Sequence, residues 1–431
     1  MKRLKRLFED RLILNFLHIL SGDAFASLLS IFSISFITKG IGLEKYGFIV
    51  LVQGVVSLID GLFNFQSWQG VIKFFPEVRD DENRLKSLIK FSYTLDMVTA
   101  LITFLIILTS SSIIGRFYNF SREEINLLLV FAIYVIFNIQ GTAIGILRSY
   151  NRFDYLRNQR VIVAIINFAL LAGGYILKLE IPYFILVYLF TNLVNSLLLN
   201  YFAMKELRRR KIFGIMKTKL HFNREFFKFT CLTNINSSLD IPVQYFDNLL
   251  VGKMLSLEQL GVYKICKTIA IALDKIGAPL YQTLYPYFCE KIVEKNYGDI
   301  FKRCLKISAI LGIFCITILL GMNVIGFSLL EKFFSQGLKN YSLEINIYLF
   351  MKSLATVTII VHPLFLAMGF IKSETKIIFI ANMIYLFVLF LLIKKLALTG
   401  VILAYGIQVL LIVFMKGFVI FEKREILKVS N

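Results

Sequence analysis

The sequence predicts an all-α, polytopic membrane protein with about twelve transmembrane helices in two six-helix bundles. A parallel internal repeat would relate the bundles around a central cavity. Three observations predict this fold. The 431 residues are 57% hydrophobic and only 18% charged, with a mean hydropathy of +0.72. Apolar runs of roughly 17–25 residues, each long enough to cross about 30 Å of hydrocarbon, recur along the whole chain. A polar pattern in the first half also returns in the second.

The repeat is visible where each half enters its second apolar span. The segment EKYG (44–47) corresponds to EQLG (258–261), 214 positions later, and at the same spacing Asp60 corresponds to Asp274. We interpret this as an internal duplication with halves of about 215 residues. Because an even number of spans is predicted per half, both halves enter the membrane with the same orientation. Their repeat axis would then run along the membrane normal.

The spans are predicted from the apolar runs in order. Residues 1–11 are basic and amphipathic and lack a small-residue cleavage site, so an interfacial helix is expected there rather than a signal peptide. The first-half spans are predicted at about 13–38, 47–70, 88–109, 124–147, 161–177 and 183–204. The second-half spans are predicted at about 226–251, 262–288, 304–328, 343–370, 377–393 and 400–421.

This pattern divides the chain into a bundle (1–204), a basic cytoplasmic linker (205–225), a second bundle (226–421) and a cytoplasmic tail (422–431). The net charge of +20 could suggest a nucleic-acid partner, but the position of the charge argues against one. The predicted inner segments, with Lys228 and Lys306 just beyond them, hold 32 Lys or Arg, the outer loops 10 and the spans 6. An excess of basic residues in short loops marks the cytoplasmic side, so both termini are expected in the cytoplasm.

Signatures of an enzyme or a metal site are absent from the sequence. The five cysteines fall in or at the ends of predicted spans, and their spacing suggests neither a disulfide framework nor metal ligands. The sequence has no phosphate-binding glycine loop, no HExxH motif and no Gly-x-Ser-x-Gly elbow. We therefore expect no enzymatic activity and no cofactor, apart from a coupling H⁺ or Na⁺.

A polar stripe follows the predicted eighth helix, from Leu257 to Glu290. At about 100° per residue, its polar side chains fall within an arc of roughly 100°. A charge near mid-bilayer costs a few kcal/mol, so this stripe is expected to face a water-filled interior. Together with a lysine in the tenth span, it makes a positive potential that favours an anionic guest. The candidate substrate-binding residues are Lys264, Lys267, Lys275 and Lys352.

Intramembrane carboxylates form the second candidate set, for ion coupling or intramembrane pairing. They are Asp23, Asp60, Asp240, Asp247 and Asp274. Structural alternatives stay open for both sets. Lys264 could reach the outer surface along its aliphatic stem, and the Asp and Lys side chains could pair with charges on neighbouring helices. His362, in the tenth span, is more often a packed core residue than a proton carrier.

Three segments resemble bacterial polysaccharide transporters, the O-antigen and capsule repeat-unit flippases of the multidrug/oligosaccharidyl-lipid/polysaccharide exporter superfamily. They are SGDAFASLLS (21–30), GLEKYGFIVLVQGVVSLIDGLFNFQSWQGVIKF (42–74) and YFDNLLVGKMLSLEQLGVYKICKTIAIALDKIGAPLYQTLYPYF (245–288). The resemblance implies two six-helix bundles around a cationic cavity in the bacterial inner membrane. It also implies transfer of an undecaprenyl-pyrophosphate-linked oligosaccharide from the cytoplasmic to the periplasmic leaflet by ion-coupled alternating access.

Two other functions are weighed against this one. A multidrug or other small-molecule exporter of the same superfamily would share the fold, but a positive stripe would repel cationic drugs. A membrane enzyme of polysaccharide assembly, such as an O-antigen polymerase, would need a large outer loop or a cytoplasmic catalytic segment, and neither is predicted. The expected partners are the lipid-linked oligosaccharide, membrane lipids and other polysaccharide assembly proteins.

Overall fold

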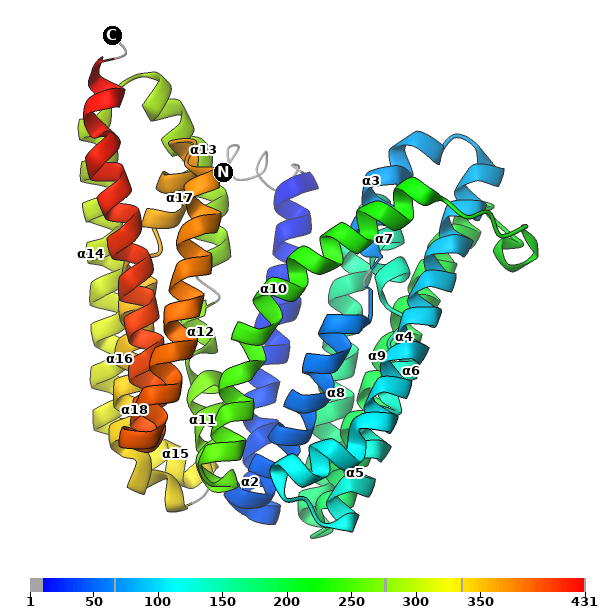
Figure 1. The fold of residues 1–431 in the computed structure, drawn as a ribbon, viewed down its shortest axis with the longest axis horizontal. Helices are drawn as coiled ribbons and strands as arrows, with labels where there is room; N and C mark the ends of the chain where they lie inside the picture. Colours follow the sequence, from blue (N-terminus) through cyan, green and yellow to red (C-terminus); the bar gives the residue numbers. More distant parts are fainter. Residues whose placement is uncertain (1–10, 66, 275–276, 335, 430–431) are drawn as a thin grey trace, which may run out of the picture. The chain divides into compact units, whose positions relative to one another are not determined.

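The computed structural model describes residues 11–65, 67–274, 277–334 and 336–429. These residues form helices joined by short turns, without a β-strand among them (Figure 1). The all-α prediction is confirmed for this part of the chain. The predicted interfacial helix at residues 1–11 lies almost wholly outside the described residues. The chain folds as two compact units, residues 1–253 (unit 1) and residues 254–431 (unit 2), and each is described by itself.

Unit 1 contains ten helical segments among its described residues. They are α2 (Arg11–Phe63), α3 (Trp68–Val78), α4 (Glu82–Tyr118), α5 (Arg122–Ala132), α6 (Tyr134–Phe137), α7 (Gly141–Ser149), α8 (Phe153–Ile176), α9 (Ile181–Arg209), the 3₁₀ turn η1 (Ile215–Lys217) and α10 (Arg224–Met254). An apolar core fills the space between α3, α4, α7, α9 and the start of α10. It includes Val71, Leu85, Ile146, Leu199 and Phe226.

Unit 2 follows from the turn after α10. Its segments are α11 (Leu257–Ile269), α12 (Ile271–Asp274), α13 (Gly277–Val293), α14 (Tyr297–Gly321), the π-helical turn η2 (Met322–Gly326), α15 (Phe327–Phe333), the 3₁₀ helix η3 (Gln336–Tyr341), α16 (Ser342–Val357), α17 (Val361–Ala367) and α18 (Ile371–Val429). Ser256 begins α11 with a capping box, in which its hydroxyl accepts from the Gln259 amide and the Gln259 side chain accepts from the Ser256 amide.

Eight helical stretches of the described residues are long and apolar enough to cross a membrane. Two of them, Leu20–Val78 and Ser373–Glu422, are long enough for two crossings of about 30 Å each. Both depart from helical backbone angles at one residue, Gly42 (φ 85°) in α2 and Ala397 (φ 47°) in α18. These residues lie where the sequence predicts turns between spans. The described helices therefore form a multi-pass membrane protein.

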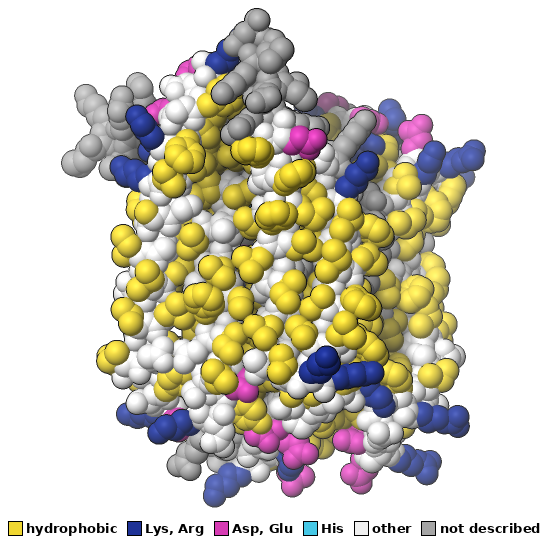
Figure 2. All heavy atoms as spheres, turned by 60° about the vertical axis from the view of Figure 1, so that its left-hand side comes forward, with side chains coloured by type: hydrophobic (Ala, Val, Ile, Leu, Met, Phe, Trp, Pro, Cys, Tyr) yellow, Lys and Arg dark blue, Asp and Glu magenta, His cyan; other side chains and the backbone are white. Residues whose placement is uncertain are grey.

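The outer surface of the molecule is largely apolar. On the face drawn in Figure 2, hydrophobic side chains fill a broad middle band, and charged side chains gather at its two ends. Large apolar side chains such as Ile113, Phe387 and Phe414 are about two-thirds exposed. Such a surface is stable in lipid, whereas a soluble protein rarely exposes so large an apolar area.

Several predicted spans are interrupted within their length. The single helix predicted over 257–290 is wrong, because α11 ends at Ile269 and the described chain continues as the separate segments α12 and α13. The second span is likewise interrupted between α2 and α3, the fourth between α6 and α7, and the tenth between α16 and α17. Pro363 gives a reason for the last break, since proline has no amide to donate to the Ile359 carbonyl one turn earlier.

Candidate functional site

Asp60 lies at the interruption of the second span, three residues before α2 ends, and is buried. Its Oδ1 accepts a hydrogen bond of 2.9 Å from the Asn64 side-chain amide. Its Oδ2 accepts one of 2.7 Å from the Asn138 side-chain amide, in the interruption between α6 and α7. Both carboxylate oxygens are thus bound by neutral donors from two broken helices, as a buried charge requires.

A chain of side-chain amides leads away from this carboxylate. Gln140 donates to Asn138 (2.6 Å), Asn195 of α9 donates to Gln140 (2.9 Å), and Gln159 of α8 donates to Asn195. In each of these hydrogen bonds, the donor is the residue that lies farther from Asp60. Aligned donors of this kind polarise one another and stabilise negative charge at the acceptor end. The chain therefore connects four helical elements of unit 1 to one carboxylate.

A second buried carboxylate, Asp96 of α4, binds the starts of two half-helices. It accepts from the backbone amides of Ser67, just before α3, and Thr142, at the start of α7, and from the Thr142 hydroxyl at 2.7 Å. Free amides at a helix start favour an anion. Gly141 permits the close approach, because a Cβ there would lie 2.7 Å from the Ser67 nitrogen. Asp96 thus holds α3 and α7 together, side by side in Figure 1.

Arginines in unit 1 were not singled out from the sequence, because they were counted as inner-loop charges. Arg160 of α8 forms an ion pair with Asp23, so the structure supplies a partner for this predicted carboxylate. Arg157, one turn earlier, lies 2.8 Å from His18. The guanidinium of Arg148, at the end of α7, lies 4.5 Å from the centre of the Trp68 ring on α3. The spacing of Arg157 and Arg160 on one helical face was the available signal.

In unit 2 the structure brings together two of the predicted lysines through three tyrosines. We call Tyr263, Tyr348 and Tyr405 the tyrosine row. Tyr263 meets Tyr348 edge to face at 6.0 Å, and Tyr348 stacks on Tyr405 at 5.9 Å. Lys267 lies over Tyr263 at 4.5 Å, and Lys352 lies over Tyr405 at 5.3 Å. The row therefore runs from α11 through α16 to α18, with a lysine at each end.

The other predicted site residues divide into those that the structure describes and those that it does not. Lys264 of α11 is partly buried, and its carbonyl accepts from the Thr268 hydroxyl. Asp247 of α10 is buried and accepts from the backbone amide of Asn248 at 2.6 Å. The side chains of Asp240 and Asp274, and the whole of Lys275, lie outside the described residues.

Unit 2 also contains a buried ionic group that the sequence did not predict. Oε1 of Glu374, near the start of α18, lies 2.8 Å from the Lys416 ammonium and 2.9 Å from His362 Nδ1. Glu374 and Lys416 are both buried. The group joins α17 to two distant parts of α18. A buried pair of opposite charges with a shared third partner fixes helices in one arrangement.

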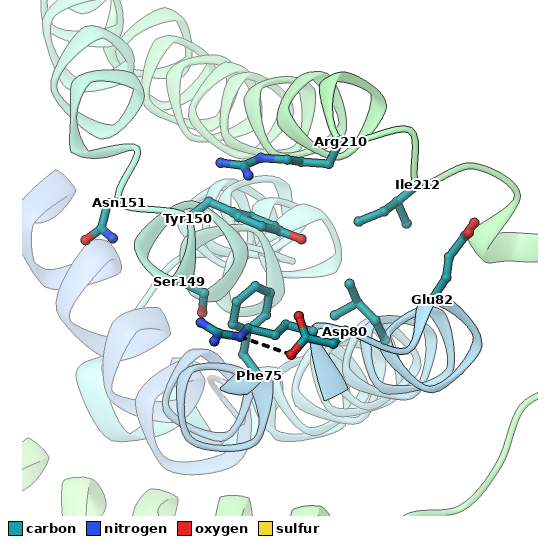
Figure 3. A pocket seen from close by; sticks show the side chains of 10 residues that line it. Phe75, Asp80, Glu82, Ser149, Tyr150, Asn151, Arg210 and Ile212 are labelled. Atoms are coloured by element: carbon teal, nitrogen blue, oxygen red, sulfur yellow. Dashed lines mark ion pairs between the residues drawn. The ribbon is translucent and has the colours of Figure 1, made fainter. Parts of the chain in front are cut away.

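A pocket of about 510 Å³ opens in the loops at one end of unit 1 (Figure 3). Arg210 lies over the Tyr150 ring at 4.8 Å, and Arg79 pairs with Asp80 at 3.6 Å (dashed in Figure 3). Charges of both signs line it, which suits a small polar ligand rather than a purely anionic one.

The wall of this pocket is stabilised by ion pairs behind it. Arg152 contacts both Asp154 and the fully buried Glu206 at 2.6 Å. The hydrogen bond with Asp154 raises the pKa of the Arg152 guanidinium above its usual range. Arg210, which lines the pocket, also pairs with Glu206 at 3.1 Å. Arg209 pairs with the same carboxylate at 3.7 Å, so buried Glu206 has three arginine partners.

Comparison with known proteins identifies the family. A family model described as "polysaccharide biosynthesis protein" matches residues 12–291. The chain belongs to this family. It is 24% identical to the inner membrane protein YghQ of Escherichia coli strain K12, over 62% of this chain and 77% of that protein. It is 21% identical to a putative O-antigen transporter of Shigella flexneri, over 91% of this chain and 93% of that protein.

Solved transporter structures share the fold. An inward-facing multidrug resistance MATE family transporter of the MOP superfamily matches with a TM-score of 0.73 and 13% identity, covering 94% of this chain and 96% of that one. The lipid II flippase MurJ, in an inward closed conformation, matches with a TM-score of 0.68 and 14% identity, covering 93% and 87%. The family resemblance noted in the sequence is thereby confirmed, and the family's named relatives are transport or membrane proteins rather than enzymes.

Proposed function

We propose that this protein is a flippase that moves a lipid-linked oligosaccharide across the bacterial inner membrane, from the cytoplasmic to the periplasmic leaflet. Family membership and the name of the Shigella relative support a role in polysaccharide export. The fold shared with the lipid II flippase supports handling of a lipid carrier. The direction of transfer assumes cytoplasmic termini, as the loop charges predict.

The tyrosine row with Lys267 and Lys352 at its ends is the observation that carries the proposal. A lysine ammonium is a point charge that binds the oxygens of a diphosphate. Tyr263 and Tyr348 are buried, so the partly buried Tyr405 is the ring of the row that would offer an apolar face to the C–H face of a sugar and a hydroxyl to its oxygens. Lysines beside tyrosines thus match a molecule that joins an anionic diphosphate to sugars. A cationic drug would be repelled by the same lysines.

Arg148 of unit 1 supports an anionic substrate independently. Its Nε is buried without a hydrogen-bond partner among the described residues, and its guanidinium stacks on Trp68. A buried donor without a partner costs about 1–3 kcal/mol. A phosphate oxygen would remove that cost on binding, because arginine forms strong charge-assisted hydrogen bonds to phosphate.

Ion coupling completes the proposed cycle. An inside-negative potential already favours outward movement of an anionic headgroup, by about 2.3 kcal/mol per charge per 100 mV. A coupling H⁺ or Na⁺ would then mainly return the empty transporter to its inward-facing state. Asp60 is the proposed site for this ion. It is buried at the meeting of two broken helices, beside the unwound backbone at Asn138, whose carbonyl accepts from the Asn64 side-chain amide.

Translocation of lipid-linked oligosaccharide in inverted membrane vesicles tests the proposal. We expect the Lys267→Ala/Lys352→Ala variant to lose roughly tenfold or more in rate, equivalent to about 1.4 kcal/mol of lost binding. The matched control is Lys306→Ala, which removes an exposed lysine of the same unit and should leave the rate unchanged. An unaltered rate in the double variant would exclude the tyrosine row as the binding site. Export of a cationic dye by a wild-type protein that moves no lipid-linked oligosaccharide would establish the multidrug function instead.

A further inference from the structure

The segment from 205 to 224, which we call the basic linker, has an unusual charge distribution. All of it is described. Its exposed basic side chains are Lys205, Arg208, Arg209, Arg210, Lys211, Lys217, Lys219 and Arg224. The one acidic residue in this range, Glu206, is fully buried and paired with arginines. The exposed charge of residues 205–224 is therefore entirely positive, and exposed Glu225 follows as the last residue of the linker that the sequence predicts over 205–225.

The basic linker is held against unit 1 at a defined position along the axis of α4. Ile212 and Ile215 are buried in the apolar core. The Lys90 ammonium donates to the carbonyls of Met216 (2.9 Å) and Thr218 (2.6 Å). Lys90 lies eight residues after the start of α4, about 12 Å along its axis. The apolar part of α4 follows directly, so this height corresponds to the headgroup layer of a membrane.

Apolar side chains project from the basic linker between the charges. Phe213, Met216, Leu220 and Phe222 are 57%, 67%, 50% and 67% exposed. The contacts of Ile212, Ile215 and Lys90 hold the linker in place, but they do not cover these four side chains within unit 1. Alternation of lysine and arginine with large apolar residues is typical of segments that lie in the membrane interface, where the apolar groups enter the acyl boundary and the cations meet phosphates.

A cavity of about 730 Å³ lies between the basic linker, α3 and α4. It is lined by the basic residues Arg84, Lys219 and Arg224 and by apolar Leu88 and Phe222, and also by two carboxylates, Glu77 and Glu225. Cations beside apolar side chains match the phosphate of a lipid together with the first carbons of its acyl chains. The carboxylates oppose any anion, so it is the apolar lining of Leu88 and Phe222 that favours a lipid over free inorganic phosphate.

We propose that the basic linker is a binding surface for anionic phospholipids of the membrane, with lipid phosphates on its lysines and arginines and its apolar side chains in the acyl boundary. The site is separate from the tyrosine row and does not depend on the transported substrate. An acidic protein partner is disfavoured, because half-exposed Phe and Met at headgroup height would be left in water. Bound lipids would fix the end of α9 and the start of α10 through the segment between them.

Lipid binding to the delipidated protein in detergent tests the charge component. Phosphatidylglycerol and cardiolipin should raise the melting temperature of the wild type, whereas phosphatidylethanolamine and inorganic phosphate at equal phosphorus should not. Lys217→Gln/Lys219→Gln/Arg224→Gln should weaken the apparent affinity by roughly tenfold or more, as expected for basic side chains near an anionic surface. The matched control is Lys302→Gln/Lys306→Gln/Lys376→Gln, which removes three exposed charges from unit 2 and should bind like the wild type.

Equal affinity in the linker variant and the control would overturn the proposal, as would equal stabilisation by phosphatidylethanolamine or free phosphate. A second measurement does not depend on the charge variants. In a Trp68→Phe background, Met216→Trp would carry the sole tryptophan of the chain. Its fluorescence should be quenched by lipids brominated in the acyl chain after reconstitution. Quenching by aqueous iodide alone would place the linker in water and refute the lipid contact.

Discussion

Corresponding helices are interrupted in the two units, but different kinds of side chain lie at the interruptions. In unit 1, the breaks in the second and fourth spans meet at Asp60 and Asp96, and both carboxylates are bound by neutral donors. In unit 2, the break between α16 and α17 lies beside Lys352, in the tyrosine row, and His362, in an ionic group with Glu374 and Lys416. The broken spans of unit 1 are thus joined by hydrogen bonds to two carboxylates, whereas basic side chains lie near the break in unit 2.

This difference assigns separate physical tasks to the two units. A carboxylate bound by neutral amides can accept a proton or a small cation without losing a salt bridge. A lysine over a tyrosine ring keeps its positive charge, and the contact with the ring itself contributes about 0.5–2 kcal/mol. Under the proposed function, unit 1 would bind the coupling cation and unit 2 the anionic headgroup. The following substitutions test whether that division holds.

Asp96→Ala has the largest expected effect. The alanine leaves two backbone amides and the Thr142 hydroxyl without their acceptor in a buried place. Each such loss costs about 1–3 kcal/mol, so we expect a destabilisation of about 3 kcal/mol or more, seen as a lower melting temperature in detergent. Asp80→Ala is the control, because that aspartate is exposed and its removal should change stability by less than about 0.5 kcal/mol.

If Asp96→Ala melted like Asp80→Ala, Asp96 would not fasten the half-helices α3 and α7. The comparison between the units would then lose its structural basis in unit 1. Asp96→Asn sharpens the result. It keeps one acceptor oxygen, so its stability should fall between those of the wild type and Asp96→Ala.

Lys416→Met should have an intermediate effect, of about 2 kcal/mol. It leaves the buried Glu374 carboxylate with His362 as its one remaining partner among the contacts described above. Removing one member of a buried ion pair costs more than removing both, because the remaining charge is uncompensated. Lys416→Met/Glu374→Gln should therefore recover most of the lost stability, which a double-mutant cycle in thermal unfolding would measure.

The exposed Lys395 provides the control for this cycle, since Lys395→Met removes a positive charge from α18 without burying an unpaired partner. A double variant as unstable as Lys416→Met alone would show that Lys416 stabilises unit 2 by packing. The ionic contrast with unit 1 would then be wrong.

The sequence predicted most of the fold because lipid imposes a simple rule on composition. Apolar runs of span length can be recognised residue by residue, and the turns near Gly42 and Ala397 lie where the runs are interrupted by polar residues. The interruption after Ile269 could not be predicted in the same way, because apolar residues continue through it. A break inside a span leaves the hydropathy pattern unchanged.

The candidate site was predicted in part for a related reason. A charge in an apolar run is conspicuous, which identified Asp60, Lys267 and Lys352. Its partner is not conspicuous, because Asn138, which binds Asp60, or Tyr405, which lies under Lys352, is an ordinary residue at a distant position in the sequence. Arg160 is the last residue before the predicted fifth span, which makes it a loop charge by sequence, although it pairs with Asp23 in the structure. Pairing across helices depends on which faces meet, and a single sequence does not specify that.

Asp60→Asn should have the smallest effect on stability and a specific effect on transport. The asparagine side chain is nearly the same shape, and the amides of Asn64 and Asn138 can turn to offer it an oxygen, so we expect a loss below about 1 kcal/mol. A neutral side chain cannot bind a proton or sodium in this way. Translocation by Asp60→Asn should therefore no longer accelerate when a pH or sodium gradient is applied to the vesicles.

The control is Asp247→Asn, which neutralises another buried carboxylate of unit 1 whose described contact is the amide of the next residue. It should keep the wild-type response to the gradients. If Asp60→Asn kept that response and Asp247→Asn lost it, ion coupling would lie on α10 rather than at the broken spans. A full response in both variants would remove these two carboxylates as the coupling site. Because Asp60→Asn is expected to melt near the wild type, lost coupling could not be attributed to unfolding.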